Sequence, residues 1–516
     1  MTEPVATPQA VEARRLVNKL WGYCHVLRDD GVSVLDYVEQ LTYLLFLKMA
    51  HEQMNRRLNP IDILDGVDAW QILLDSDGRT LENAYAEILD TLAKKGGTLG
   101  RIFQKSQNRI QDPAKLKRLI YELIDKENWS STGVDIKGDA YEELLARGAE
   151  DIKSGAGQYF TPRPLIRAIV DCIQPTPDDS IIDPACGTGG FLLSAFEYIQ
   201  DHHSGSFTPE QRYRLSSGAI RGNELVDGTA RLAAMNLLLH GIGQPNGDSL
   251  IDVGDALAQP PARHGSVVLA NPPFGRKSSI TVIGEDDEFE SKDLTYNRRD
   301  FWTTTTNKQL NFLQHIYTLL RTDGRAAVVV PDNVLFEGGA GETIRRRLLM
   351  QCDVHTLLRL PTGIFYAGGV KANVLFFHKP PPRPDGRPQT KTLWVYDFRS
   401  NQHFTLKQRP LRREHLDDFV LAYRPAQPRE NRLRSPFFRP YYVDELLARD
   451  KVNLDVFADI TDIALSDQES QLDPRVLVEE VIEELQSALS EFAAVAASLR
   501  DQEAGDDSED SVAGLS

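Results

Sequence analysis

The spacing of hydrophobic residues changes near residue 150 of the 516-residue chain. Before that point, apolar residues recur every three or four positions, and the segment 34–49 is densely apolar, which is typical of helices. After residue 180, short apolar runs alternate with helical stretches; the runs lie at residues 181–182, 219–220, 267–269 and 326–330. Short buried strands alternating with helices indicate a parallel sheet covered by helices. We therefore predict a helical domain over residues 1–150 and an α/β domain over residues 151–440.

The end of the chain has other patterns. Apolar runs at 374–377 and 393–395 flank a proline-rich loop at 380–388, which we predict to be irregular. After helix-start signals at Asp473 and Pro474, apolar residues recur every seven positions, at Val478, Leu485, Phe492 and Leu499. This repeat fits a short coiled coil and a single amphipathic helix equally well. We predict a helical segment for subunit association within residues 441–500.

Net charge gives conflicting signals about a nucleic-acid partner. A formal charge of −17 argues against one, because phosphate binding relies on Lys and Arg. Residues 501–510 hold six carboxylates and no Lys or Arg, however, which predicts a disordered acidic tail over residues 501–516. Basic residues gather elsewhere, with Arg101, Lys105 and Arg109 at the four-residue spacing of a helix face and further clusters at 115–118, 298–299 and 345–347. An acidic chain that acts on DNA needs such patches, a partner subunit, or both.

Cysteine usage and hydropathy limit the class of protein. Cys24, Cys172, Cys186 and Cys352 lie far apart and match neither a zinc pattern nor a disulfide framework, so we expect free thiols and no bound metal. No stretch approaches the roughly 20 apolar residues that cross a bilayer. The N-terminus has neither the basic nor the apolar region of a signal peptide. We expect a cytoplasmic protein with no membrane partner.

A glycine-rich turn at residues 186–190 joins an apolar strand to a helix start. Glycines let the backbone pass close to a ligand, although tight structural turns use glycine as well. Glu224 follows the second strand, where a carboxylate can accept hydrogen bonds from ribose hydroxyls; the polar segment 202–217 before it is interpreted as an inserted loop. Asp255 suits an adenine amino group or a helix cap. Because Asp183 would repel phosphate, the pattern favours S-adenosylmethionine, which carries a sulfonium and an ammonium group.

The apolar run at 267–270 leads directly into Asn271-Pro272-Pro273-Phe274. Such a strand end faces the ligand crevice of a doubly wound sheet, and the two prolines fix the backbone. The Asn271 side-chain oxygen and a carbonyl of the proline region are then rigid acceptors for the two protons of a base amino group. Phe274 offers an aromatic face to a base taken out of its stack. A packed, proline-terminated strand explains the tetrapeptide alone equally well, but not its order after the glycine turn and two carboxylates.

Three motifs in order resemble the modification subunit of type I restriction-modification systems: Gly-Gln-Tyr-Phe-Thr-Pro at 157–162, Asp-Pro-Ala-Cys-Gly-Thr-Gly at 183–189, and the tetrapeptide. Residues 359–365, residues 370–377 and the helical N-terminal region are also similar to stretches of that family, so the resemblance covers most of the chain. It implies an α/β fold in which a helical N-terminal domain precedes a doubly wound, Rossmann-like S-adenosylmethionine-dependent methyltransferase domain and a C-terminal helix. Methylation of adenine N6 in duplex DNA, in preference to cytosine N4, is implied by the resemblance alone.

The resemblance also implies roles for single residues. It places residues 158–163 over the methionine end of the cofactor, Thr188 to Gly190 beneath it and Glu224 on the ribose. The expected cofactor-binding residues are Gln158, Tyr159, Phe160, Thr161, Pro162, Arg163, Asp183, Gly187, Thr188, Gly189, Gly190, Glu224 and Asp255. The expected catalytic residues are Asn271, Pro272, Pro273 and Phe274.

The family's modification subunit works with a separate DNA-specificity subunit, commonly as two modification subunits to one specificity subunit, and a restriction subunit can join them. No segment of this chain stands out as an independent base-reading domain, which agrees with recognition by a partner. The hypothesis is direct methyl transfer to a flipped adenine, because no cysteine lies in a setting suited to a covalent base intermediate. Two other interpretations stay open: a methyltransferase acting on an amide or amino nitrogen of RNA or protein, and an inert assembly subunit.

Overall fold

The computed structural model describes residues 15, 18–23, 34–55, 62–64, 66–127, 129, 161–274, 279–283, 289–293, 295–365, 371–399, 404 and 409–456. Several predictions from sequence fall outside these residues: the roles of Gln158, Tyr159 and Phe160, the heptad helix after residue 473, and the acidic tail.

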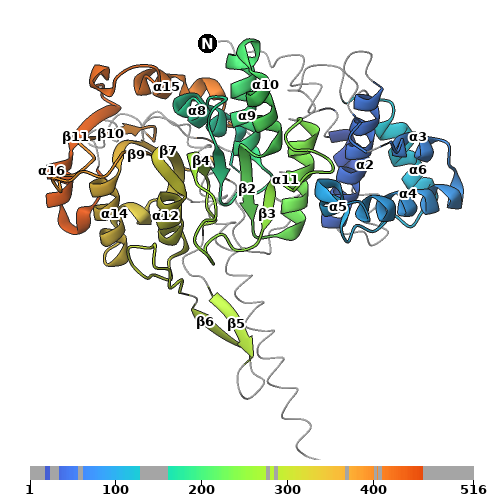
Figure 1. Ribbon diagram of the computed structural model, residues 1–516, viewed down its shortest axis with the longest axis horizontal. Coiled ribbons are helices and arrows are strands. Elements are labelled where there is room, and N and C mark those ends of the chain that lie inside the picture. The colour runs from blue at the N-terminus through green and yellow to red at the C-terminus, as the bar shows by residue number, and fades with distance from the viewer. Residues whose placement is uncertain are drawn as a thin grey trace, which may run out of the picture.

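The N-terminal region is helical, as predicted, and lies at one end of the molecule beside α11 (Figure 1). Its elements are α2 (Val34–Met54), α3 (Ala69–Leu74), α4 (Gly78–Ala93), α5 (Gly97–Phe103), α6 (Pro113–Arg118) and a π-helical turn, η1 (Leu119–Ile124). Aspartates cap three of these helices, because the side chains of Asp68, Asp77 and Asp112 accept backbone N–H groups at their starts. α5 begins against the segment between residues 239 and 251 of the α/β region: Thr98 donates its N–H to the Gly247 carbonyl at 2.8 Å.

Within the described ranges, nine strands form the main sheet, in the order β11-β10-β8-β9-β7-β4-β1-β2-β3. The strands are β1 (Ile181–Asp183), β2 (Ile220–Glu224), β3 (Ile251–Val253), β4 (Gly265–Ala270), β7 (Leu320–Pro331), β8 (Asp353–Arg359), β9 (Ala372–Lys379), β10 (Thr392–Asp397) and β11 (Phe438–Tyr442). β9 runs antiparallel to β7 and β8, and β11 runs antiparallel to β10; the other pairs are parallel. The predicted parallel α/β sheet is therefore confirmed, with two antiparallel strands added.

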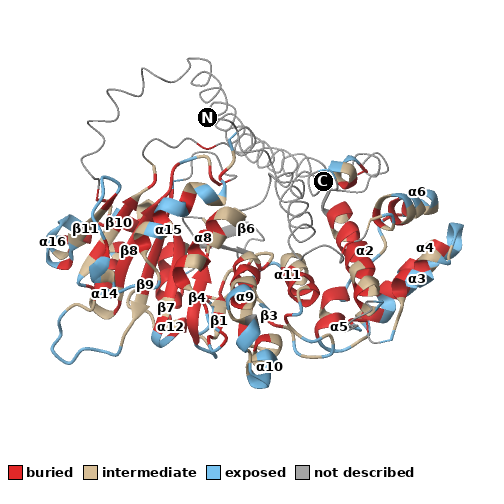
Figure 2. Ribbon diagram, turned by 90° about the horizontal axis from the view of Figure 1, so that it is seen from above, coloured by how far each residue is buried: buried red, intermediate tan, exposed pale blue. Residues whose placement is uncertain are grey.

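Helices cover both faces of this sheet, and side-chain alternation in β4 assigns the faces. Val267 and Leu269 belong to the core with α8 (Arg163–Ile173), α9 (Gly190–His203) and α11 (Asp227–Leu239). Val268 and Ala270 point into the opposite core with α12 (Lys308–Leu319) and α14 (Ala340–Gln351). Since successive strand residues face opposite sides, a strand buried on both faces reads as the continuous apolar run seen in the sequence. Figure 2 shows the buried residues concentrated along the sheet and on the helix faces toward it.

The remaining elements lie at the margins. α10 (Pro209–Ser217) precedes β2, α13 (Asn333–Phe336) follows β7, α15 (Asp417–Tyr423) packs on α8, and α16 (Val443–Ala448) follows β11. β5 (Ser279–Ile283) and β6 (Phe289–Asp293) form a separate antiparallel hairpin that projects from the body in Figure 1. Along the part of the chain that the structure describes, no helix has the length and hydropathy of a membrane span.

Two sequence interpretations need correction. Residues 202–217, interpreted as an inserted loop, contain α10, whose start is capped by Thr208 and Gln211 in a reciprocal capping box. Arg101, Lys105 and Arg109 do not share a helix face, because α5 ends at Phe103 and Lys105 has a φ of 65°. The proline-rich loop at 380–388 is irregular, as predicted.

β11 crosses the domain boundary predicted at residue 440, and Leu446, Val452 and Leu454 pack in the same core as α12.

Candidate active site

The sheet topology brings the two chemical motifs together. From β1 the chain proceeds through β2 and β3 toward one edge, and through β4 and β7 toward the other, so the order reverses between β1 and β4. A crevice opens beyond the carboxyl ends of parallel strands at such a switch point. Asp183 ends β1, and Asn271 follows β4, which pairs with β1 in register at Ile182 and Val268. The glycine turn and the tetrapeptide thus follow two neighbouring parallel strands at the same end of the sheet, where such a crevice is expected.

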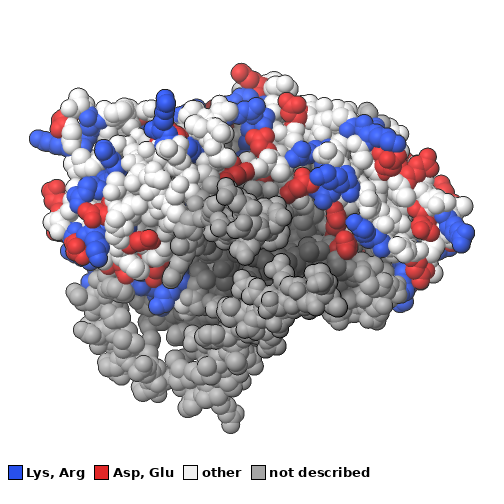
Figure 3. Space-filling model, turned by 90° about the horizontal axis from the view of Figure 1, so that it is seen from below, with Lys and Arg blue, Asp and Glu red and all other residues white. Residues whose placement is uncertain are grey.

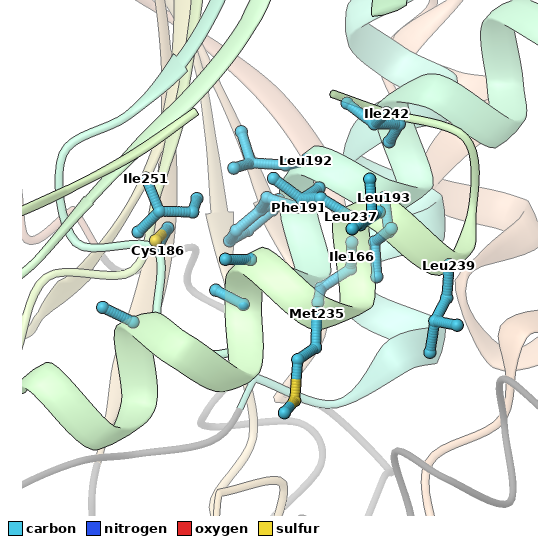
Figure 4. Close-up of a cluster of buried hydrophobic side chains, with 14 of the residues drawn as sticks. Ile166, Cys186, Phe191, Leu192, Leu193, Met235, Leu237, Leu239, Ile242 and Ile251 are labelled. Carbon is cyan, nitrogen blue, oxygen red and sulfur yellow. The ribbon is translucent and has the colours of Figure 1, made fainter. Parts of the chain in front are cut away.

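The glycine turn is held against β2 by close packing. A Cβ on Gly222 would lie 2.6 Å from Cys186 Sγ and 2.9 Å from Ile251 Cδ1, so only glycine fits there. Figure 4 shows Cys186 and Ile251 next to each other at this point. Gly187 and Gly189 have φ values of 54° and 88°, which favour glycine, and a Cβ on Gly187 would meet none of the described residues within 4 Å. Close packing at Gly222 therefore fixes the turn from the β2 side.

A buried asparagine on α11 also positions the turn. Asn236 is fully buried, and its Nδ2 donates to the Thr188 carbonyl at 3.2 Å. Sequence reasoning did not select this residue, since it lies 48 positions after Thr188 within an ordinary helical pattern. The apolar side chains around it, Phe191 to Leu193 on α9 and Leu237 on α11, pack together in Figure 4.

Two carboxylates lie beneath and beside the turn. Asp183 is 1% exposed, accepts the Ala185 N–H at 3.0 Å and takes part in no ion pair with the described residues. Burial raises its pKa to about 8, and the charge of Glu224 adds to this effect against the Ala185 hydrogen bond. Burial also raises the pKa of Glu224, although its oxygens accept the N–H groups of Gly187 and Val226 at 3.0 and 2.9 Å. Buried carboxylates without a cation make this site complementary to a positively charged ligand.

Asp255 follows β3 and is held by two hydrogen bonds. Its Oδ1 accepts the Leu257 N–H at 2.9 Å, and its Oδ2 accepts the Tyr296 hydroxyl at 2.6 Å. The first bond is a local turn of the kind that aspartate often forms. The second comes from a segment 41 residues away, which the sequence did not indicate. Asp255 is fixed near the cofactor turn, and its contact with adenine stays a prediction.

Two side chains from distant elements fix the Asn-Pro-Pro-Phe turn. Thr161, just before α8, accepts a hydrogen bond from Asn271 Nδ2 at 2.7 Å. Because Nδ2 of the Asn271 amide is held by this contact, its Oδ1 is the atom that can accept a hydrogen bond from a ligand. Gln309, on α12 and 3% exposed, donates from Nε2 to the Pro273 carbonyl at 2.7 Å. Sequence reasoning assigned Thr161 only to the cofactor and missed Gln309, which lies 36 residues beyond Pro273 in a helical pattern.

Phe274 is half-buried and meets Phe365 edge to face, with ring centroids 6.0 Å apart. Phe365 is 2% exposed and comes from the segment 359–365 that the resemblance includes. The contact with this buried neighbour holds the Phe274 ring in place. Such support suits a ring that must present its face to a flat ligand.

Other predicted residues have ordinary structural contacts. Arg163 donates to Ser194 Oγ at 2.9 Å and lies 3.9 Å from Glu197, both on α9. Its cofactor role stays a prediction, as do those of Pro162 and Gly190. Burial raises the pKa of the Cys186 thiol well above its usual value, so this cysteine is not an activated nucleophile.

The basic clusters do not form one free cationic face. Arg101 lies 3.7 Å from Asp227, and Arg109 lies 3.8 Å from Asp36. Arg298 is 9% exposed and pairs with Asp300. On the face shown in Figure 3, Lys and Arg side chains are interspersed with Asp and Glu over the described surface. The described part of this face thus lacks a large single-sign patch of the kind that binds DNA without help.

Comparison with known proteins identifies the family to which the chain belongs. A family model described as N-6 DNA Methylase matches residues 132–468, and one described as HsdM N-terminal domain matches residues 16–126. The methylase subunits of the type I restriction enzymes StySJI, from Salmonella typhimurium, and EcoKI, from Escherichia coli, are each 41% identical over 427 residues, covering 79% of this chain and 76% of theirs. A solved structure assigned as a modification subunit of a type I restriction enzyme from Vibrio vulnificus YJ016 matches with a TM-score of 0.67 at 24% identity, covering 91% of this chain and 100% of that chain. That last likeness concerns the fold alone.

The chain therefore belongs to the N-6 DNA methylase family, as a methylase subunit of the type I restriction-modification kind. It is an adenine-specific DNA methyltransferase with a Rossmann-like fold. Members of this family are S-adenosylmethionine-dependent.

Proposed function

We propose that this chain binds S-adenosylmethionine across the carboxyl ends of β1, β2 and β3 and methylates the N6 nitrogen of a flipped adenine held at the Asn271 turn. The observation that carries the proposal is the joint position of two rigid features at the β1/β4 switch point. One is a glycine turn above buried carboxylates, and the other is an Asn-Pro-Pro-Phe turn fixed by Thr161 and Gln309.

The residues around the glycine turn fit the cofactor. Asp183 is a buried carboxylate without a cation among the described residues, which suits the ammonium or sulfonium group. Glu224 and Asp255 stand in order along β2 and β3, at the positions proposed for the ribose and the adenine ring. The open space above Gly187 leaves room for a ligand to reach the backbone. When bound, the cofactor supplies an electrophilic methyl group.

The turn at Asn271 is suited to activate the adenine amino nitrogen, which is a weak nucleophile. The lone pair of an aromatic amino nitrogen is delocalised into the ring, so N6 attacks poorly. Asn271 Oδ1 and the Pro272 carbonyl accept its two N–H protons, favour a pyramidal nitrogen and stabilise the positive charge that develops on it. Phe274, supported by Phe365, stacks on the flipped ring. One proton then leaves the methylated nitrogen.

Sequence recognition is proposed to belong to partner subunits. The described part of the face in Figure 3 mixes both charge signs, and the whole chain has a charge of −17. A DNA-specificity subunit, a second copy of this chain and, in the complete assembly, a restriction subunit are the proposed partners, with duplex DNA as substrate. The segment 474–500 is the proposed association surface, and a cytoplasmic location agrees with this role.

One labelling experiment tests the proposal. The chain, co-expressed with its neighbouring specificity subunit, is incubated with methyl-tritiated S-adenosylmethionine and duplex DNA, RNA or protein. Label is expected in DNA, and after digestion it is expected to co-migrate with N6-methyl-2′-deoxyadenosine. Label in RNA or protein alone, or in N4-methylcytosine, contradicts the proposed substrate. Absence of label together with absence of cofactor binding favours an inert assembly subunit.

A further inference from the structure

A cavity lies toward the amino ends of the parallel strands, at the end of the sheet opposite the Asn271 turn. It has a volume of about 640 Å³, and its lining includes the end of α8, the starts of β7 and β8, the end of β9 and the loop after α15. Arg325, on β7, is in register with Val267 on β4, four residues before Asn271. The cavity is therefore displaced from the base-binding turn by about 13 Å along the strands, at about 3.3 Å per residue. It belongs to neither the cofactor site nor the base site.

Guanidinium groups dominate the lining of this cavity. Four arginines contribute, whereas Glu430, an exposed residue, is the one acidic side chain among the described lining residues; the arginines are Arg325, Arg424, Arg429 and Arg432. Two of them are already neutralised. Arg325 binds Asp179 at 2.8 Å, and Arg429 pairs with Asp353.

The other two arginines have no carboxylate partner among the described residues. Arg432 is 5% exposed; its Nε and Nη1 donate to the carbonyls of Tyr423 and His355 and to Thr356 Oγ1, and Nη2 donates to no described residue. The Arg424 side chain has a single hydrogen bond with the described residues, from Nη1 to the Asn431 carbonyl at 2.6 Å. The Tyr423 carbonyl at the end of α15, and the rings of Tyr423 and Phe438 that lie 4.6 and 5.8 Å from the Arg432 guanidinium, offset part of this charge. A buried guanidinium with an unused arm beside a cavity nevertheless remains costly without an anion.

The two histidines that line the cavity, His355 and His378, add no positive charge to it. Burial, with the charges of Arg429 and Arg432, lowers the pKa of His355 well below its usual value. Burial and Arg429 also lower the pKa of His378, against the opposite effect of Asp323 and Asp353. Both rings are therefore neutral near pH 7 and act as hydrogen-bonding groups. The positive charge of the cavity comes from its arginines.

We propose that this cavity is a binding site for a small anion with more than one phosphate group, of the pyrophosphate or nucleoside-triphosphate class. The guanidinium fork matches phosphate oxygens in geometry and charge. The volume lies within the range of small-molecule sites, about 300–1,000 Å³. Arg424, Arg429 and Arg432 approach from one loop, and Arg325 approaches from the sheet, so the arginines surround space for a polyanion. The site is independent of methyl transfer and of the proposed cofactor contacts.

The test is calorimetric titration of the full chain with sodium pyrophosphate in a phosphate-free buffer. Saturable binding is expected, and Arg424→Gln is expected to weaken it about tenfold, because one charge-assisted contact is lost. Arg432→Lys, which keeps the charge but loses the fork, is expected to weaken it as well. Arg434→Gln is the matched control, since Arg434 is exposed, lies on the same loop and is not part of the lining; it is expected to bind like the wild type.

Parallel titrations with a nucleoside triphosphate and with a duplex that lacks the target site identify the source of the phosphate. Binding of pyrophosphate or triphosphate that falls in Arg424→Gln and persists in Arg434→Gln supports the proposal. Equal affinity in all variants overturns it, as does absence of binding at millimolar anion. Loss of duplex binding alone, without pyrophosphate binding, assigns the arginines to a DNA backbone and also overturns it. Unchanged S-adenosylmethionine affinity in Arg424→Gln shows that the variant is folded.

Discussion

Two aspartates at opposite ends of one strand have opposite electrostatic environments. Asp179, just before β1, is buried, which raises its pKa, but hydrogen bonds and charge from Arg325, together with Ser266 and Thr176, outweigh this effect and leave the pKa below its usual value. Asp183, at the other end of β1, is buried with no cation partner among the described residues, and its pKa rises to about 8. Asp179 is thus satisfied within the protein. Asp183 can instead pair with a positively charged ligand. This difference distinguishes the amino end of β1, which is structural, from its carboxyl end, where we propose that the ligand binds.

The largest effect within this comparison is expected for Asp183→Asn. Cofactor affinity should fall about ten- to a hundredfold, because a charged hydrogen bond contributes roughly 1.5–3 kcal/mol. The same variant should be more stable than the wild type at pH 8. Between the ordinary value of 3.8 and about 8, folded Asp183 holds more protons than the unfolded chain does, so the wild type loses stability as pH rises through that window.

Calorimetric titration with S-adenosylmethionine and thermal melts from pH 5 to pH 8.5 check both parts. The stability advantage of the variant should grow with pH and disappear toward pH 4. An advantage that does not change with pH would show that Asp183 is not the titrating group, and undiminished affinity would remove it from the cofactor site.

Asp179→Asn is expected to act on stability alone. It leaves the Arg325 guanidinium without its carboxylate, which should cost about 2 kcal/mol at pH 7. Because the pKa of Asp179 is lowered, this contribution is present above the ordinary value of 3.8 and is lost as pH falls through the lower folded value. Asp178→Asn, at an exposed neighbour that lies 3.8 Å from Arg214, is the control and should change stability much less. Denaturant unfolding compares the two, and equal losses would contradict the distinction.

A smaller effect is expected at the base-binding turn for Gln309→Leu. Loss of the hydrogen bond to the Pro273 carbonyl should lower kcat about tenfold while the cofactor Kd stays the same, because the turn no longer holds its acceptors in place. Gln314→Leu provides a matched control: Gln314 is equally buried on α12 but bonds to Thr303, away from the turn. If both variants lose kcat equally, the effect belongs to α12 as a whole and not to the contact with Pro273.

The sequence predicts the parts of this site that depend on local pattern. The strand runs at 181–182 and 267–269 and the motifs that follow them place Asp183 and Asn271 at one crevice, since the carboxyl ends of parallel strands share an edge. The residue that follows a buried strand can be predicted because the length of the strand and the turn residues after it are both visible in the local sequence. The helical N-terminal region is predictable for the same reason, from spacing alone.

What the sequence does not predict are contacts set by tertiary packing. The bonds from Gln309 to Pro273, from Asn236 to Thr188 and from Tyr296 to Asp255 join residues 36, 48 and 41 positions apart. Each of these side chains sits in an ordinary helix or loop pattern, so nothing local distinguishes it. The opposite pKa shifts of Asp179 and Asp183 are hidden in the same way, because both depend on which charges the fold brings near.

The central claim is that the Asn271 turn activates an adenine amino group, and Asn271→Ala tests it most directly. Methyl transfer to duplex DNA, with the specificity subunit present, is expected to fall on the order of 10²–10³-fold, because one of two acceptors for the developing charge is removed. S-adenosylmethionine should bind with unchanged affinity, since Asn271 itself is not among the proposed cofactor contacts. Methyl transfer that persists near the wild-type rate in this variant would contradict the account.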